Sequence, residues 1–180
     1  MEFGFSKEHA LLKQMYREFA ETEVKPLAAE VDENERFPVE TVEKMVKAGF
    51  MGIPFPKKYG GEGGDNLGYA MAVEELSRVC ATTGVILSAH VSLGAHPIYQ
   101  FGTEEQKQKF LVPMAKGEKI GAFGLTEANA GTDASAQQTT AVLDGDHYII
   151  NGSKIFITNA GYADTYVIMA MTDKSAGTRG

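Results

Sequence analysis

Cysteine is nearly absent from this 180-residue sequence, which contains only Cys80. A single cysteine excludes an internal disulfide and any zinc or iron–sulfur site built from several cysteines, and it fits a reducing compartment. We expect Cys80 to be a small buried hydrophobic residue on a helix. The four histidines also lack metal-ligand spacing such as HExxH, so no metal site is expected.

Positive charge is also scarce, because the formal net charge is −7 and neither end of the sequence carries a block of lysine or arginine. This charge balance argues against nucleic acid as a partner. The first residues include Glu2 and Glu8 beside few apolar residues and do not have the pattern of a secretory signal peptide. We therefore expect a cytoplasmic protein.

Charged residues are missing from one long stretch, residues 81–103, which could cross a bilayer by its length alone. The stretch nevertheless holds His90, His96, Pro97 and Gln100, which a lipid-facing helix disfavours. We expect a buried core helix here and no membrane partner.

Helical periodicity dominates residues 1–117. Ser6 is placed to cap a helix, and a second helix is expected from Pro38 with Gly49 at its end. Thr103 and Gln106 have the spacing of a capping box for a later helix. These signals predict an all-α helical bundle.

From residue 118 the pattern changes to short runs rich in β-branched and aromatic residues. The runs expected to be strands are IGAFGL, QTTAVL, HYIIN, KIFITN and TYVIMAM. Asp144–Gly145 and Asn151–Gly152 have tight-turn chemistry and predict hairpins. The fold class is therefore α+β, with a helical domain over residues 1–117 followed by an antiparallel β domain that begins over residues 118–180.

Two segments of the β part have residues that could bind a polar ligand. Residues 123–133, FGLTEANAGTD, enter a loop rich in hydroxyl groups and small residues, which lets backbone N–H groups approach an anionic ligand. Residues 156–159, FITN, place an aromatic ring beside a hydroxyl. On residue chemistry alone, an ordinary polar connection and an ordinary strand explain these segments better.

In longer form, FGLTEANAGTDAS and INGSKIFITNAG resemble the paired flavin-binding motifs of acyl-CoA dehydrogenases, most like the short-chain (butyryl-CoA) type. The segments GIPFPKKYGGEGG, AVEELSR, SLGAHPIYQFGTEEQKQKFLVP and VIMAMTDKS also follow the family order, so the resemblance covers nearly the whole chain. It implies FAD-dependent α,β-dehydrogenation of a short-chain acyl-CoA to the trans-2-enoyl-CoA. It also implies an electron-transferring flavoprotein as electron acceptor and assembly as a homotetramer.

The resemblance implies roles for residues at the cofactor. Thr126 and Thr158 would hydrogen-bond the isoalloxazine ring of FAD, and Phe156 would stack on it. Gly131 and Thr132 would approach the pyrophosphate. The residues expected at the cofactor are Phe123, Gly124, Leu125, Thr126, Gly131, Thr132, Phe156, Ile157 and Thr158.

The resemblance also places substrate-binding residues. Thr132 would face the CoA moiety, and the helix that carries Ile86, Ala89 and Leu93 would wall the acyl cavity. Because Ile86 is bulky, we expect a short acyl group of about four carbons.

No catalytic residue is assigned, because the family's catalytic glutamate belongs to a carboxy-terminal domain beyond these residues. We expect the 180-residue chain alone to be inactive, and we expect Glu127 to have a structural role rather than an acid–base role. An acyl-CoA oxidase, in which oxygen reoxidises the same flavin, is one alternative function. A non-catalytic binding or assembly module is another, although both flavin motifs are intact.

Overall fold

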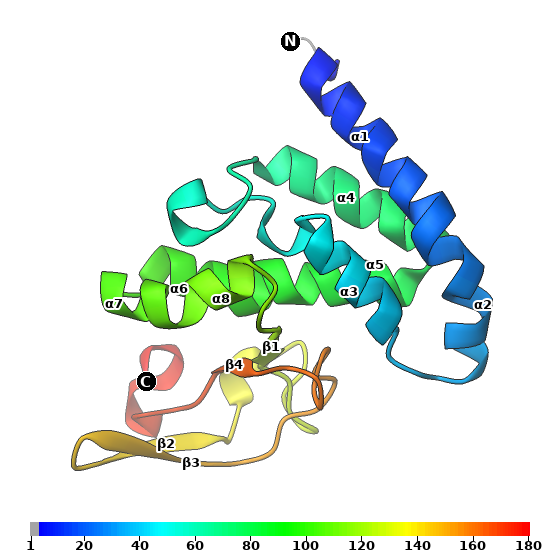
Figure 1. The fold of residues 1–180 in the computed structure, drawn as a ribbon. Coiled ribbons are helices and arrows are strands. Elements are labelled where there is room, and N and C mark those ends of the chain that lie inside the picture. The colour runs from blue at the N-terminus through cyan, green and yellow to red at the C-terminus, as the bar shows by residue number, and fades with distance from the viewer. Residues whose placement is uncertain (1–3) are drawn as a thin grey trace.

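The computed structural model describes residues 4–180 (Figure 1). Most helical elements come before the first strand and lie together above the strands in Figure 1. They are α1 (Lys7–Phe19), η1 (Ala20–Val24), α2 (Lys25–Glu33), α3 (Val39–Lys47), η2 (Phe50–Gly52), η3 (Lys57–Tyr59), α4 (Asn66–Val79), α5 (Ala81–Ser88), η4 (Ala89–Ala95), α6 (His96–Phe101), α7 (Glu104–Gln106), η5 (Lys107–Leu111) and α8 (Val112–Ala115). Two short helices, η6 (Ala134–Ala136) and η7 (Lys174–Arg179), belong to the β part. The strands are β1 (Gly121–Gly124), β2 (Thr140–Asp144), β3 (His147–Asn151) and β4 (Thr165–Ile168). The α+β fold class expected from the sequence is therefore confirmed.

The predicted helix starts are confirmed by their caps. The Ser6 hydroxyl accepts the backbone N–H of His9 at 3.1 Å and begins α1. Thr103 and Gln106 form the capping box, since the Thr103 N–H donates to Gln106 Oε1 at 2.8 Å and the Gln106 N–H donates to Thr103 Oγ1 at 3.2 Å. Gly49 follows α3 with a φ of +77°, a left-handed conformation that glycine adopts without steric cost.

The hydrophobic core lies among the helices. The stretch without charged residues forms α5, η4 and α6 in succession, and Leu87, Val91 and Ala95 on it are buried in the core. The prediction of a buried helix is confirmed, and none of the helices in residues 4–180 has the length and apolar character needed to cross a bilayer. Cys80 is buried as expected, but it joins α4 to α5 in an extended conformation, so its placement on a helix was wrong.

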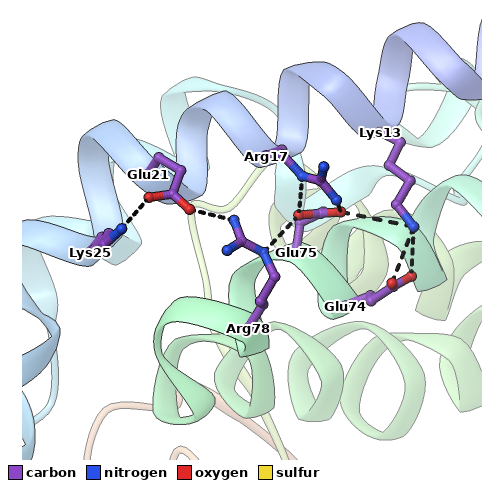
Figure 2. A network of polar contacts seen from close by, with 7 residues as sticks. All are labelled: Lys13, Arg17, Glu21, Lys25, Glu74, Glu75 and Arg78. Carbon is purple, nitrogen blue, oxygen red and sulfur yellow. Dashed lines mark hydrogen bonds and ion pairs between the residues drawn. The ribbon is translucent and has the colours of Figure 1, made fainter.

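An ion-pair network holds α1 and η1 against α4 (Figure 2). At its centre the buried carboxylate of Glu75 accepts hydrogen bonds from Arg17 Nε and Nη2 at 3.0 and 2.8 Å and from Arg78 Nε at 3.2 Å. Arg78 also donates to Glu21 at 2.6 Å, which extends the network toward Lys25. The bonds join segments that are far apart in sequence, so the network fixes the packing of two helices.

The strands form two separate pairs. β2 and β3 form the predicted hairpin, with Asp144 opposite His147 and Gly145 at a φ of +64° in the turn. β1 and β4 are parallel, with Gly121 opposite Thr165 and Gly124 opposite Ile168. The expectation of a wholly antiparallel arrangement was therefore wrong here. The chain between β1 and β4 passes through a long loop and the β2–β3 hairpin, and such a crossover can return a strand in the same direction.

The predicted strand KIFITN is also wrong. Residues 152–159 form an irregular segment, because Phe156 and Asn159 adopt positive φ values of 58° and 70°, which an extended strand does not allow. Asn151–Gly152 does not make a second hairpin. Gly152 is instead pressed against the backbone of Thr139, where an added Cβ would lie 2.7 Å from the Thr139 Cα.

Candidate functional site

A cleft of about 270 Å³ lies where the charge-free helix meets the β part. Three segments line it. Ala89 and Leu93 come from consecutive turns of η4, and the end of β1 with the residues after it forms the second wall. The irregular segment after β3 forms the third wall. The complete lining is Ala89, Leu93, Phe123, Leu125, Thr126, Phe156, Ile157 and Thr158.

The cleft brings together most, but not all, of the residues expected at a cofactor. Six of the nine line it, and they come from both sequence motifs. Gly124 is buried behind the wall, where an added Cβ would lie 2.8 Å from Ile168 Cδ1 on the neighbouring strand. Gly131 and Thr132 are on the loop after β1 and lie outside the lining.

Of the helix residues expected at the acyl group, two line the cleft and one does not. Ala89 and Leu93 line the cleft, whereas Ile86 is buried and does not. Its backbone oxygen instead accepts a hydrogen bond from Asn159 Nδ2 at 3.2 Å. Ile86 therefore does not shape this cleft, and its role at the acyl group stays a prediction.

Glu127 supports the loop wall from beneath rather than facing the cleft. Glu127 is 8% exposed, and its carboxylate accepts hydrogen bonds from the backbone N–H groups of Gln138 at 2.6 Å and Thr139 at 2.9 Å and from Lys154 Nζ at 2.9 Å. The nearby Thr139 hydroxyl, the Gln138 amide and the Lys154 ammonium hold the pKa of Glu127 at about 2. The Thr139 hydroxyl makes no hydrogen bond of good geometry in residues 4–180. The two backbone amides and Lys154 are therefore the main causes of the lowered Glu127 pKa. Glu127 is a fixed anion, which is consistent with a structural role.

The two motif segments are also joined directly. The Ile155 N–H donates to the Thr126 backbone oxygen at 2.8 Å, and Lys154 Nζ donates to the Leu125 backbone oxygen at 2.8 Å. The walls of the cleft are therefore held at a fixed separation by bonds that run between residues far apart in sequence.

The chemistry of the lining suits a flat, partly polar ring system. Phe156 is 88% exposed, and a large exposed aromatic side chain beside an apolar wall is typical of a binding surface. Thr126 and Thr158 add hydroxyl groups that can donate or accept hydrogen bonds at a ring edge. The cleft volume lies near the lower end of the range for ligand pockets, so it suits part of a ligand such as a ring rather than a whole dinucleotide. An isoalloxazine ring fits these residues.

Sequence analysis assigned no individual role to three residues that support the site. Lys154, Asn159 and His90 each bond to backbone atoms of the walls or of the strand behind them. A lone histidine, a lysine and an asparagine carry little information by themselves, because their partners are distant in sequence. Among residues 4–180, no group of three or more histidine, cysteine, aspartate or glutamate residues could hold a metal ion.

Two family models match this chain in succession. Residues 6–118 match "Acyl-CoA dehydrogenase, N-terminal domain", and residues 122–180 match "Acyl-CoA dehydrogenase, middle domain". The chain belongs to the acyl-CoA dehydrogenase family. Members of this family bind FAD, and the resemblance stated from the sequence motifs is confirmed.

Individual members of the acyl-CoA dehydrogenase family show how far the similarity extends. The chain is 70% identical over its full length to a short-chain specific acyl-CoA dehydrogenase of Clostridium acetobutylicum and covers 48% of that protein. The solved butyryl-CoA dehydrogenase of Megasphaera elsdenii is 49% identical with a TM-score of 0.94, and the match covers 100% of this chain and 48% of that one. A chain in the structure described as the electron transferring flavoprotein of Acidaminococcus fermentans is 59% identical with a TM-score of 0.96, over 100% of this chain and 47% of that one. The chain thus spans about half the length of the relatives it matches.

Proposed function

We propose that this chain supplies the flavin-holding part of a short-chain acyl-CoA dehydrogenase, which oxidises an acyl-CoA to the trans-2-enoyl-CoA. The observation that carries this proposal is the cleft itself, in which the two motif segments meet beneath η4. Thr126 and Thr158 would hydrogen-bond the edge of the isoalloxazine ring, and Phe156 would lie against its face. Hydrogen bonds to the ring tune its reduction potential.

The remaining expected contacts belong to the same proposal. Phe123, Leu125 and Ile157 would complete the walls around the ring, with Gly124 holding β1 close to β4. Gly131 and Thr132 would meet the pyrophosphate and the CoA moiety on the exposed loop, outside the cleft. We also propose that the helical and β domains meet near residue 117, between the end of α8 and the start of β1.

FAD, when bound, would accept a hydride from the substrate β carbon. The residues of this chain would hold and orient the ring, and none of them is proposed as the base that removes the α proton. Glu75 is fully engaged in the helix network, and Glu127 is clamped by two amides and Lys154. We place the base in the further half that the relatives possess, and we expect the 180-residue chain alone to be inactive.

The names of the relatives support the finer parts of the proposal. The short-chain and butyryl-CoA relatives favour a short acyl group. The similarity to a chain in an electron-transferring flavoprotein structure favours that flavoprotein as electron acceptor. We propose a homotetramer by resemblance to the family.

FAD titration tests the proposal. FAD is added to the purified chain, and binding is followed by the visible absorption spectrum and by quenching of flavin fluorescence. We expect binding in the wild type and weaker binding in Thr126→Val and Thr158→Val, which keep side-chain shape but remove the hydroxyl. Thr172→Val is the matched control, because Thr172 is an exposed threonine of the β part outside the cleft. Equal affinity in all four proteins would contradict the assigned roles.

Substrate addition separates cofactor binding from catalysis. Anaerobic butyryl-CoA is added to the FAD-loaded chain together with an electron acceptor. A flavin spectrum that stays oxidised is the expected result, because the base lies elsewhere. Bleaching of the flavin would mean that a group in residues 1–180 already removes the α proton.

A further inference from the structure

The segment that carries Phe156 and Thr158 is held in an unusual conformation. Phe156 and Asn159 have φ values of 58° and 70°, and neither is glycine. Positive φ is uncommon for non-glycine residues, more so for a bulky aromatic than for asparagine, and it persists only where the surroundings enforce it. The segment is not part of a strand, so no ladder of backbone hydrogen bonds keeps it in place.

Lys154 anchors the start of this segment. Its side chain is 8% exposed, and its ammonium group donates to the Leu125 backbone oxygen at 2.8 Å, to Glu127 Oε1 at 2.9 Å and to Gln137 Oε1 at 2.9 Å. A lysine ammonium has three donors, so all of them are used. This leaves Lys154 no free proton for a ligand, and it ties the segment to the loop wall on the other side of the cleft.

Asn159 anchors the end of the segment. Its amide Nδ2 donates to the Gly121 backbone oxygen at 3.0 Å, on β1, and to the Ile86 backbone oxygen at 3.2 Å, on α5. Its Oδ1 is buried without a hydrogen-bond partner in residues 4–180. An unpaired buried acceptor is unfavourable, so the amide keeps this orientation because of its two donor bonds. One side chain therefore joins the segment to the helical part and to the first strand.

We propose that Lys154 and Asn159 are positioning residues, which act through Phe156 and Thr158 to set the flavin face and edge contacts. Neither lines the cleft. Lys154 ties the start of the segment to the residues after β1, and Asn159 ties its end to β1 and to α5, the helix that leads into η4. This inference rests on the proposed function. It adds that two residues outside the cleft lining hold Phe156 and Thr158 in place.

Three variants remove or disrupt the anchoring hydrogen bonds. Lys154→Met keeps chain length but loses all three donors. Asn159→Gly accepts positive φ at no steric cost and loses both bonds, whereas Asn159→Asp keeps size but turns an acceptor toward two carbonyl oxygens. Lys119→Met and Asn151→Asp are the matched controls, since both residues are exposed and lie outside the cleft lining.

The first measurement is hydrogen exchange at the amides of residues 155–158, with and without FAD, beside the melting temperature of each variant. The Ile155 amide is a direct reporter, because it is bonded to the Thr126 oxygen at 2.8 Å. We expect faster exchange at this segment in the anchor variants and unchanged exchange in the controls. Exchange equal to wild type in Asn159→Gly and Lys154→Met would overturn the anchoring role, whether or not FAD binds.

The second measurement is FAD affinity together with the visible circular dichroism of bound flavin. We expect the anchor variants to bind FAD about tenfold more weakly, by analogy with the loss that follows removal of residues that orient metal ligands. We also expect them to alter the flavin signal. In a Phe156→Ala, Thr158→Val background the added loss from Lys154→Met should disappear, which a general loss of stability would not produce. A full additional loss in that background would refute action through these two residues.

The two proposals fail in different ways. If the wild type does not bind FAD, the proposed function fails for this chain, and hydrogen exchange still decides whether the residues anchor the segment. If the wild type binds FAD and the anchor variants bind it equally well with faster exchange, the proposed function stands and the positioning role is wrong. Should Lys154→Met not fold, Asn159→Gly provides the same comparison.

Discussion

The imidazole of His90 in η4 is hydrogen-bonded to the backbone of Gly121, the first residue of β1, with 3.0 Å between Nδ1 and the amide nitrogen. On the other side of the ring, Nε2 lies 3.1 Å from the Met114 backbone oxygen. Because a carbonyl oxygen can only accept, Nε2 carries the proton, and Nδ1 accepts from Gly121. The neutral ring satisfies both neighbours, whereas a protonated ring would place a proton on Nδ1 facing the Gly121 N–H.

The burial of His90 predicts a loss of stability in mild acid. Burial lowers the pKa of His90 from 6.5 to about 4. The unfolded chain therefore binds more protons between those values, and stability is fully present above pH 6.5 and is lost as the pH falls toward 4. From pH 7.5 to pH 5 this one residue should remove about 2 kcal/mol from the free energy of unfolding.

Urea unfolding of wild type and His90→Asn at the two pH values measures this contribution. Asparagine keeps an acceptor near the Gly121 amide but does not titrate. We expect the pH dependence of the variant to be smaller by about 2 kcal/mol. His147→Gln is the matched histidine control, since His147 is exposed on the β2–β3 hairpin. Equal pH dependence in wild type and His90→Asn would contradict the buried neutral state.

Glu75 and Glu74 are adjacent in sequence but should respond very differently to neutralisation (Figure 2). Arg17, followed by Arg78, holds the pKa of Glu75 below its usual range, and the carboxylate is buried. Glu75→Gln would replace the charged hydrogen bonds from Arg17 and Arg78 with weaker ones to a neutral, buried amide. We therefore expect a loss of about 2 kcal/mol in the free energy of unfolding. Glu74 is exposed, and within residues 4–180 its ion pair is with Lys13 alone, so Glu74→Gln should change stability by less than about 0.5 kcal/mol. Urea unfolding at pH 7 compares them, and equal losses would refute the central role of Glu75.

Local chemistry predicted much of this structure, and distant partners account for what it missed. The caps at Ser6 and Thr103 depend on residues three positions away, so the sequence alone identifies them. The run KIFITN has the composition of a strand, yet contacts to Leu125, Glu127 and Gly121, far away in sequence, hold it in an irregular form. The parallel pairing of β1 with β4 likewise depends on a partner that no local pattern reveals.

The sequence likewise predicted only part of the candidate site. The family motifs assigned Thr126 and Phe156 to one ligand although they are far apart in sequence, and both residues line the same cleft. The resemblance assigned Ile86 to the same helix wall as Ala89 and Leu93, but Ile86 does not line this cleft, because the side of a helix that faces a cleft depends on packing. No role was predicted for His90, because its bond to Gly121 exists only when helix and strand are placed together.

Two glycines distinguish backbone packing from ligand approach. An added Cβ at Gly94 would lie 2.9 Å from Gly121 Cα, so Gly94→Ala should push β1 from η4 and cost about 1–3 kcal/mol. An added Cβ at Gly131 would meet nothing within 4 Å, so Gly131→Ala should change stability by less than about 0.5 kcal/mol. If Gly131 meets the pyrophosphate, its alanine variant should still bind FAD about tenfold more weakly. Unchanged FAD affinity in a stable Gly131→Ala would remove Gly131 from the proposed site.

Glu127 and Lys154 form a buried pair, so their substitutions should not be additive. Lys154→Met leaves the Glu127 carboxylate without its counter-charge. Glu127→Gln likewise leaves the Lys154 ammonium without its counter-charge. Removing one partner of a buried pair is more damaging than removing both. We therefore expect the double variant to melt at a higher temperature than Lys154→Met alone.

The same double variant separates charge from position at the cleft. It restores electrical neutrality but not the bond from Lys154 to the Leu125 oxygen, which links the two walls. We expect FAD affinity to stay low while thermal stability recovers, because neutral side chains relieve the buried charge without fixing the wall. Recovery of both quantities together would mean that the pair acts on FAD only through overall stability. The comparison needs only melting curves and FAD titrations of the wild type, the two single variants and the double variant.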